Sequence, residues 1–455
     1  MVFSSIEFLL YFLPIFMILY GITPNAYKNL TLLAGSIIFY ALGEPKYLLL
    51  LVISLVVNYL IGLDLAEESR ANRKRTNKGK NKRKRLLILA VVGNVGVLML
   101  FKGAPNELGL PLGISFYTFQ ILSYLIDVYQ GTIKRETSIW KLSTYISMFP
   151  QLVSGPIVNY SEVEEQLSHR KLTAANIQDG LKVFTMGLAS KVLLADRIGL
   201  LWNHVQMTGY QSISTPLAWM AAIGYSMKIY FDFYGYSLMA VGLGRMLGFE
   251  LPQNFREPYM AKGVRDFYRR WHMTLGRWFR QYVYIPLGGN RKGELRTVLN
   301  LLVVWILTSI WHGSTLNFLM WGMMIWLCIV LERWLGRIQV LQHLRILPRV
   351  YLWTVIPVTW MCFAITDLSQ LQVYLGRMFG LSEGINVNAS DWLRLLADYK
   401  WLFAVCLIAC TPVVRKVYHK IKDNIVGEIL LGILFWVCVV QLIVAGENTF
   451  MYFRF

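Results

Sequence analysis

The chain has 455 residues, of which 56% are hydrophobic and only 16% are charged, and its formal net charge is +19. A soluble protein would carry about 25% charged residues, so this composition excludes an ordinary soluble enzyme. Apolar runs near the length of a membrane-spanning helix recur along the whole sequence. The sequence therefore predicts an all-α polytopic membrane protein.

Apolar segments predict the membrane spans in chain order: 5–23, 30–42, 47–63, 86–101, 109–131, 216–247, 299–311, 316–335, 350–365, 401–414 and 425–444. When short or tilted helices are counted, about ten to twelve spans are expected. The stretch 142–170 is interrupted by Pro and Gly, which predicts a re-entrant or cavity-lining element. The sequence shows no internal repeat, which argues against many transporter folds.

Ten Lys or Arg side chains lie between Arg70 and Arg85. Such a block predicts a cytoplasmic loop, here 67–85, that also meets anionic lipid headgroups. A short loop between two apolar segments is a poor nucleic-acid site, so no nucleic-acid partner is expected. The apolar N-terminal run lacks a basic start and a cleavage site, and it is expected to remain as the first helix.

Outside the stretch 265–322, the cysteines and one Lys–Asp pair in apolar runs are interpreted as structural residues. The five cysteines all lie inside apolar runs without metal-ligand spacing, which predicts small core residues. Asp232 lies within one helical turn of Lys228 in an apolar run. This spacing predicts a buried Lys228–Asp232 pair that neutralises both charges.

The stretch 265–322 combines a basic amphipathic segment with an apolar run that carries a histidine. Helical spacing places one set of side chains on a polar face and another on an apolar face: Arg265, Arg269, His272 and Arg280 against Phe267, Trp271, Leu275, Trp278 and Tyr282. Pro286, Gly288 and Gly289 are predicted to end this helix. The apolar run 299–311 then leads to His312 and Gly313.

The two histidines of this stretch are the strongest candidates for chemistry. An ionisable group such as His312 is expensive in a membrane, and a neutral imidazole can accept a proton from a hydroxyl. The alternative is a packing histidine bonded to a backbone carbonyl, with Asn317 as a neighbouring amide that orients it. His272 is flanked by arginines that disfavour the imidazolium, so it is expected to orient a substrate, to relay a proton or to face headgroups.

The arginines of the stretch suit an anionic ligand. Arg binds phosphate through a planar fork, and the GGN loop at 288–290, which directly precedes Arg291, offers backbone N–H groups. Snorkelling to lipid phosphates is the alternative for each arginine. The sequence has no HExxH motif, no Cys/His cluster and no GxSxG elbow.

Several motifs together resemble the membrane-bound O-acyltransferase (MBOAT) family, and in particular its bacterial alginate O-acetyltransferase branch. They include PLGISFYTFQILSYLIDVY, FPQLVSGPI, YFDFYGYSLMAVGLGRMLGF, NFREPY, DFYRRWHMTLGRWFRQYVYIPLGGNR and WHGSTLNFLMWG, in the order of that family. The resemblance implies a bundle of tilted helices with re-entrant and interfacial helices around a central funnel. It also implies His312 and His272 as catalytic residues.

The sequence departs from the branch at four places. Tyr234 and Leu238 stand where the branch has Ser and Asp, Tyr268 stands where it has Trp, and Ser309–Ile310 stand where it has Gly-Leu. These changes leave both histidines intact and leave the acceptor polymer open. Around the histidines, we expect the substrate or donor to be bound by Arg269, Arg270, Trp271, Arg277, Arg291, Trp311 and Asn317.

The expected reaction moves an acyl group, in the first place acetyl from acetyl-CoA, from the cytoplasmic side to a polysaccharide hydroxyl outside the membrane. The resemblance implies an extracytoplasmic esterase-like partner, no bound cofactor and a place in the bacterial inner membrane. We expect one domain over 1–455, with N-terminal helices 1–103, a catalytic core 104–335 and C-terminal helices 336–455. The alternatives are D-alanyl transfer to teichoic acid, a polysaccharide exporter, or a non-catalytic membrane scaffold.

Overall fold

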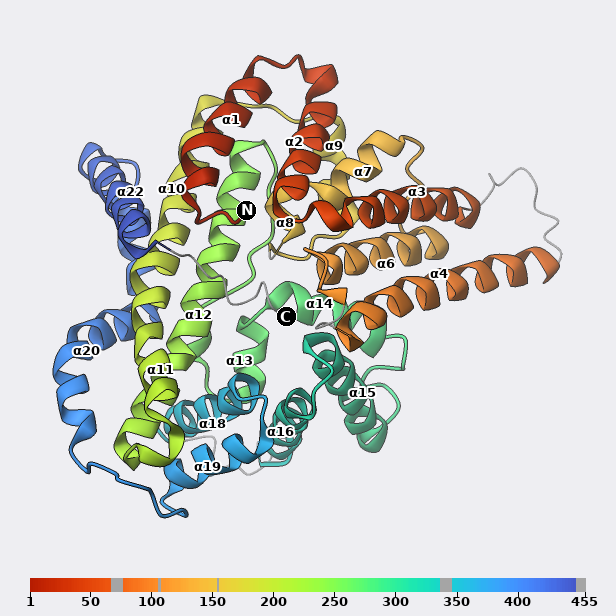
Figure 1. Ribbon diagram of the computed structural model, residues 1–455. Coiled ribbons are helices and arrows are strands. Elements are labelled where there is room, and N and C mark those ends of the chain that lie inside the picture. Colours follow the sequence, from red (N-terminus) through yellow and green to blue (C-terminus); the bar gives the residue numbers. More distant parts are fainter. Residues whose placement is uncertain (67–76, 105–107, 154, 336–345, 447–455) are drawn as a thin grey trace. The chain divides into compact units, whose positions relative to one another are not determined.

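The computed structural model describes residues 1–66, 77–104, 108–153, 155–335 and 346–446 (Figure 1). Within these ranges every regular element is helical. This confirms the predicted all-α class. The chain divides into two compact units, of which the first holds 1–184, 236–252 and 445–455 and the second 185–235 and 253–444. Two of the boundaries, 184/185 and 235/236, fall inside helices α10 and α12, and the single domain over 1–455 stays a prediction.

The first unit is built from the N-terminal helices. Its elements are η1 (Glu7–Phe12), α1 (Leu13–Ile22), η2 (Asn25–Tyr27), α2 (Lys28–Gly43), η3 (Pro45–Tyr47), α3 (Leu48–Leu65), α4 (Asn77–Gly103), α6 (Ile114–Gln130), α7 (Ile139–Ser147), α8 (Phe149–Leu152), α9 (Tyr160–Ser168) and the first part of α10 (Ala174–Ala189). Helices α3, α4 and α6 lie side by side (Figure 1). Gly113 begins α6 with φ +71°, and a Cβ there would lie 2.2 Å from the Leu152 carbonyl oxygen. A tight turn with such a close approach requires glycine.

Two predictions fall on this unit. The basic loop was expected over 67–85, but helix α4 already begins at Asn77, so the described part of the block extends a helix; residues 67–76 lie outside the described ranges. The stretch 142–170 is interrupted as expected, with α7, α8 and α9 as short helices and mostly buried side chains. Its re-entrant character stays a prediction.

The second unit contains both candidate histidines. Its elements are η4 (Ser190–Ala195), α11 (Asp196–Thr208), η5 (Tyr210–Ser212), the first part of α12 (Thr215–Met246), η6 (Pro258–Met260), α13 (Val264–Arg270), α14 (Met273–Phe279), η7 (Arg280–Tyr284), α15 (Glu294–His312), α16 (Leu316–Leu335), α18 (Leu347–Ala364), α19 (Leu368–Phe379), α20 (Asp391–Ala409), α21 (Pro412–Ile421) and α22 (Ile425–Ala445). Helix α16 packs against α15, α13 and α18. It is therefore the helix around which the candidate site is assembled.

Five helices in the described ranges are long and apolar enough to cross a membrane: Pro45–Leu65, Asn81–Gly103, Glu294–His312, Leu316–Leu335 and Ile425–Ala445. The helices Asp391–Ala409 and Pro412–Ile421 form a sixth if this pair, bent by 74°, is one broken span. The chain is a multi-pass membrane protein. The higher count of ten to twelve includes shorter segments such as α2 and α6, and it stays a prediction.

The predicted helix that begins near Arg265 is wrong in one respect. The structure breaks it after Arg270, and His272 adopts φ +44° and ψ +53° before α14 begins. The apolar side chains keep a helical spacing across the break because α13 and α14 each bury an apolar face. His272 consequently does not share the face of Arg265, Arg269 and Arg280, which are exposed, while its own side chain is buried.

Asp232 has a partner that the sequence did not predict, in addition to the electrostatic attraction of Lys228. The ion pair to Asp232 comes from Lys191, with Nζ 3.2 Å from Oδ1. Lys191 also pairs with Asp196 at the start of α11. Lys191 lies in η4, a π-helical turn between α10 and α11. Spacing along α12 alone does not reveal this partner because it comes from another helix.

Candidate functional site

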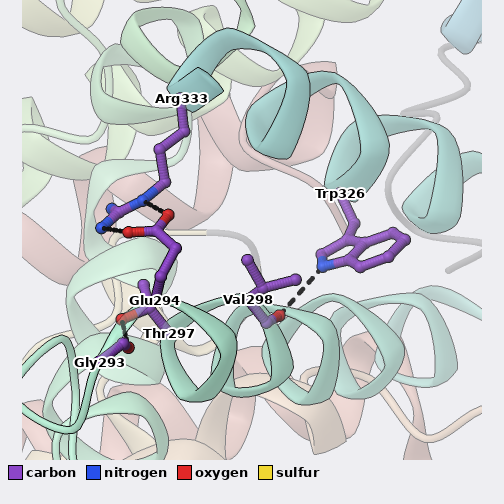
Figure 2. A network of polar contacts seen from close by, with 6 residues as sticks. All are labelled: Gly293, Glu294, Thr297, Val298, Trp326 and Arg333. Atoms are coloured by element: carbon purple, nitrogen blue, oxygen red, sulfur yellow. Dashed lines mark hydrogen bonds and ion pairs between the residues drawn. The ribbon is translucent and has the colours of Figure 1, made fainter. Parts of the chain in front are cut away.

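Helices α15 and α16 form an antiparallel pair that carries His312 at one end. At the opposite end, the Arg333 guanidinium donates from Nε and Nη2 to the two carboxylate oxygens of Glu294 (Figure 2). Between the two ends, Trp326 Nε1 donates to the Val298 carbonyl at 3.2 Å (Figure 2). Glu294 lies in the first turn of α15 and Arg333 in the last turn of α16, where each charge complements its helix dipole. The pair thereby fixes the register of the helix that ends at His312.

The same two helices approach closely near the end that carries His312. A Cβ at Gly322 of α16 would lie 1.9 Å from Ser309 Oγ of α15, so a larger residue there would require the Ser309 side chain to move. The Ser309 hydroxyl donates to the Trp305 carbonyl at 2.8 Å. Ser309, one of the departures from the branch, therefore packs against α16, while Ile310 is exposed.

His312 is the last residue of α15, and its imidazole lies in an aromatic cage. The ring centroids of Trp311, Trp321 and Phe363 lie 4.6, 5.0 and 5.1 Å from its own, all at steep interplanar angles. Only 6% of His312 is exposed. Gly313, which follows it, is extended and lies against the Phe318 ring. The cage fixes the ring and keeps most water away from it.

His272 lies at the turn between α13 and α14. Glu332 of α16 places its carboxylate on the backbone N–H groups of Val264 and Arg265, which caps the N-terminus of α13. A Cβ at Gly263 would lie 2.8 Å from that carboxylate, so glycine permits the approach. Helix α16 thus positions both histidine-bearing elements.

Trp311 connects the two histidines. Its ring centroid lies 6.1 Å from that of His272, and it directly precedes His312. A second aromatic route joins Trp271 to Trp360 at 5.0 Å and Trp360 to Phe363 at 5.4 Å, and Phe363 contacts His312. The structure therefore brings together four of the predicted site residues: His272, His312, Trp311 and Trp271.

His272 is an uncharged imidazole in this environment. Only 3% of it is exposed, and this burial lowers the pKa of His272 to about 3. The predicted direction was right, but the predicted cause was the neighbouring arginines, whereas the structure gives burial. Phe233 contacts the ring edge-to-face at 4.7 Å, which adds to the apolar surroundings.

Asn254 belongs to the site and was missed by the sequence analysis. Its side-chain oxygen lies 3.0 Å from His272 Nδ1, and it is 2% exposed. The motif NFREPY contains Asn254, 18 residues before His272. The motif could have indicated that Asn254 is important. Its partner could not be inferred, because a polar residue between two helices follows no helical periodicity.

The predicted donor-binding arginines are less buried than the histidines. Arg269 and Arg291 are exposed, and Arg277 and Arg270 are half-buried. Arg270 Nε donates to Asp266 at 3.1 Å, so this guanidinium is paired within α13. Exposed guanidinium groups can reach a ligand at the surface, but they do not line the aromatic cage.

The expectation of free N–H groups in the GGN loop, residues 288–290, is wrong for two of them. The N–H groups of Gly288 and Gly289 donate to the carbonyls of Ile285 and Tyr284 at 2.9 Å. Asn300 of α15 donates to the Gly289 carbonyl, which ties the loop to the helix. The loop therefore positions Arg291 rather than presenting these two N–H groups to an anion.

Asn317 does not orient His312 as was expected. Its Nδ2 donates to the Cys362 carbonyl at 3.0 Å, and its Oδ1 accepts from Thr315. The side chain is fully buried. It joins α16 to α18, so its contribution to the site is to hold Phe363 beside His312.

A cavity of about 630 Å³ lies between α16 and α19. Its lining is largely apolar and includes Met320, Leu371, Leu375 and Phe379. Neither histidine is among the lining residues. This cavity is therefore separate from the site formed by the two histidines.

The arrangement combines two buried imidazoles, a low-dielectric aromatic surrounding and cationic groups nearer the surface. Such a site can take a proton from a hydroxyl and transfer it, and it can exclude water from a reactive acyl group. The described residues contain no group of three or more His, Cys, Asp or Glu side chains that could hold a metal ion.

Comparison with known proteins gives consistent matches. The sequence model of the MBOAT, membrane-bound O-acyltransferase family, matches residues 133–368. A probable alginate O-acetylase of Pseudomonas fluorescens is 35% identical over 84% of this chain and 76% of its own length. A peptidoglycan O-acetyltransferase of Helicobacter pylori is 30% identical over 100% of this chain and 98% of its own length. A teichoic acid D-alanyltransferase of Bacillus subtilis is 30% identical over 48% of this chain and 58% of its own length.

Proposed function

The chain belongs to the membrane-bound O-acyltransferase family, and from this premise we propose that it moves an acetyl group from cytoplasmic acetyl-CoA to a polysaccharide hydroxyl outside the membrane. O-acyl transfer is the activity of the family. The polysaccharide acceptor is supported by the names of two relatives, an alginate O-acetylase and a peptidoglycan O-acetyltransferase. Both cover most of the chain, whereas the D-alanyltransferase covers about half.

The observation that carries the proposal is the burial of His312 at the end of an apolar helix inside an aromatic cage. In the proposed reaction, His312 removes the proton from the acceptor hydroxyl. The oxygen attacks the thioester carbonyl, and the tetrahedral adduct collapses with cleavage of the C–S bond. The departing thiolate takes up the proton from the imidazolium, so the enzyme returns to its starting state. Each step keeps the charged species inside a site with little water.

The arginines are proposed to bind the donor before this step. Arg269, Arg277 and Arg291 are exposed or half-buried and can meet the phosphates of CoA at the surface. Trp271 and Trp311 would lie beside the acyl group, because the ring of Trp311 lies next to His272 and the ring of Trp271 contacts Trp360. An esterase-like partner outside the membrane would complete delivery to the polymer, and the inner membrane of a bacterium is the proposed location.

The test uses purified protein with isotope-labelled acetyl-CoA and soluble alginate or peptidoglycan fragments. Wild-type protein should release free CoA and label the polymer. His312→Ala should lower turnover by about 10²–10⁴-fold, because general-base catalysis typically contributes that much. His312→Gln serves as a second variant of similar volume, and thermal unfolding checks that both variants fold.

Three results would contradict parts of the proposal. Turnover of the His312 variants equal to wild type would remove His312 from the chemistry. Acetylated wild-type protein, found by mass spectrometry in the absence of acceptor, would replace the general-base route with an acyl-histidine. Turnover only with a D-alanyl carrier protein would replace acetyl-CoA as the donor.

A further inference from the structure

The segment before α13, which contains Asn254, is hydrogen-bonded to the backbone on both sides of His272. Its backbone carbonyl accepts from the Met273 N–H at 2.9 Å, and two residues later the Arg256 N–H donates to the Arg270 carbonyl at 2.9 Å. His272 is held between these two contacts in the left-handed region, where a residue other than glycine is strained. The segment therefore restrains the backbone of His272 from both sides.

The side chain of Asn254 has a fixed orientation. Its Oδ1 accepts from the Thr274 backbone N–H at 3.3 Å and from Thr274 Oγ1 at 3.0 Å. A backbone N–H only donates, so the amide atom that faces it must be the oxygen and not the NH₂ group. The same oxygen faces His272 Nδ1 at 3.0 Å. Because an amide oxygen only accepts, Nδ1 must carry a proton.

The second ring nitrogen is then determined. A neutral imidazole carries one proton, so protonation at Nδ1 leaves a lone pair at Nε2. Burial favours the neutral ring. His272 Nε2 is buried and has no hydrogen-bond partner among the described residues. A buried acceptor without a hydrogen-bond partner destabilises a folded protein. A ligand that donates a hydrogen bond to Nε2 would remove this penalty.

We propose that Asn254 is a positioning residue that holds His272 as the Nδ1–H tautomer, so that Nε2 accepts a hydrogen bond from an O–H group of the ligand. The ligand class follows from the tautomer. An acceptor nitrogen can orient a hydroxyl or receive its proton, but it cannot donate to the oxyanion that forms on the thioester carbonyl. The assignment of that hydroxyl to the sugar acceptor rests on the proposed function. The tautomer of His272 follows from the hydrogen bonds of Asn254 and is independent of the proposed function.

The consequence for the reaction is a division between the two imidazoles. His272 orients the hydroxyl through Nε2, and His312 removes its proton. Loss of the Asn254 oxygen would let the ring of His272 populate both tautomers and rotate. A mixture of tautomers and a mobile ring would lower kcat/KM by roughly 10–100-fold, the loss that typically follows removal of the hydrogen-bond partner of a metal-bound histidine.

The experiment reads the tautomer directly. Protein labelled with ¹⁵N-histidine in detergent micelles or nanodiscs is studied by NMR, and the His272 signals are assigned by their loss in His272→Gln. Wild type should show a protonated Nδ1 and an unprotonated Nε2 at pH 7. Asn254→Leu should show a mixture of tautomers and the reduced kcat/KM. Asn58→Leu is the matched control, because Asn58 is also buried and its amide donates to Ser54 and Asn94, which belong to the first unit.

A second variant keeps the test decisive if Asn254→Leu does not fold. Asn254→Asp retains the acceptor oxygen and should keep the Nδ1–H tautomer, but its charge stabilises the imidazolium. The acid limb of kcat/KM should therefore move to higher pH. A proton on Nε2 in the wild type, or an acid limb that is the same in Asn254→Asp and wild type, would overturn the proposal. Because the tautomer is read without substrate, failure of acetyl transfer would leave this result intact and would count only against the proposed function.

Discussion

At the scale of single residues, the site depends on keeping an imidazole uncharged. His272 is almost fully buried, its pKa is lowered to about 3, and its surroundings are aromatic. In the unfolded chain a histidine has a pKa of about 6.5. Between these two values the unfolded state binds more protons than the folded state, so acidification destabilises the fold.

This difference predicts a pH-dependent stability. As the pH falls from 6.5 to 5, the free energy of unfolding should decrease by about 2 kcal/mol on account of His272, at about 1.4 kcal/mol per pH unit. Thermal unfolding of the solubilised protein at several pH values measures it. His272→Gln, which has no titrating ring, should show a shallower dependence. Equal slopes in both proteins would mean that His272 is charged in the folded state.

A second residue-scale prediction concerns Lys191, which serves two carboxylates. It pairs with Asp232 and Asp196, and only 1% of its side chain is exposed. Removal of one partner of a buried pair costs about 3–5 kcal/mol because the remaining charge is uncompensated. Lys191→Met leaves two carboxylates without it, whereas Asp232→Asn leaves Lys191 with Asp196. Chemical denaturation should therefore find Lys191→Met the less stable variant, and the reverse order would contradict the shared pairing.

At the scale of elements, the sequence predicted the apolar helices well and their interruptions less well. The ends of α16 and α22 lie within two residues of the prediction because long apolar runs bounded by polar residues define a helix. The break at His272 was missed, since the periodicity of apolar residues persists across it. The cap that Glu332 provides for α13 comes from 67 residues further along the chain and has no local signal.

The candidate site shows the same limit. Motif similarity identified both histidines, whereas neither Asn254 nor the cage around His312 followed from spacing. Phe363 and Trp321 reach His312 from two other helices. Contacts of that kind depend on tertiary packing, which a single sequence does not specify. The same holds for the ion pair between Asp232 and Lys191, because Lys191 comes from another helix and the spacing along α12 does not reveal it.

The close approach of α15 and α16 gives a prediction at this scale. Gly322→Ala should destabilise the protein by about 1–3 kcal/mol, because the new methyl group would overlap Ser309 Oγ. Ser309→Gly removes both the hydroxyl and the Cβ that face Gly322. The double variant Ser309→Gly/Gly322→Ala should therefore regain part of the stability and the acyl-transfer rate in a thermal-unfolding and turnover comparison. Additive losses in the double variant would show that the two positions do not meet.

At the scale of the whole molecule, the proposed reaction requires that donor and acceptor reach the site from opposite sides of the membrane. By the positive-inside rule, we expect the basic block between Arg70 and Arg85 to lie on the cytoplasmic side. In the proposed function, the acetyl donor comes from the cytoplasm and the acceptor polymer lies outside. Access from one side only would not support transfer across the membrane. The proposed function therefore requires that the donor enters from one side and the acceptor from the other.

Reconstituted vesicles test this sidedness. In the variant Thr76→Cys, a membrane-impermeant maleimide reports which side of the vesicle carries the basic block; the five native cysteines lie within apolar segments. Free CoA should be released when acetyl-CoA is added on the side that carries Cys at position 76, and the label should appear on polymer supplied on the other side. His312→Ala vesicles control for leakage and for spontaneous hydrolysis. Release only from the opposite side would invert the proposed direction, because the basic block would then face away from the donor.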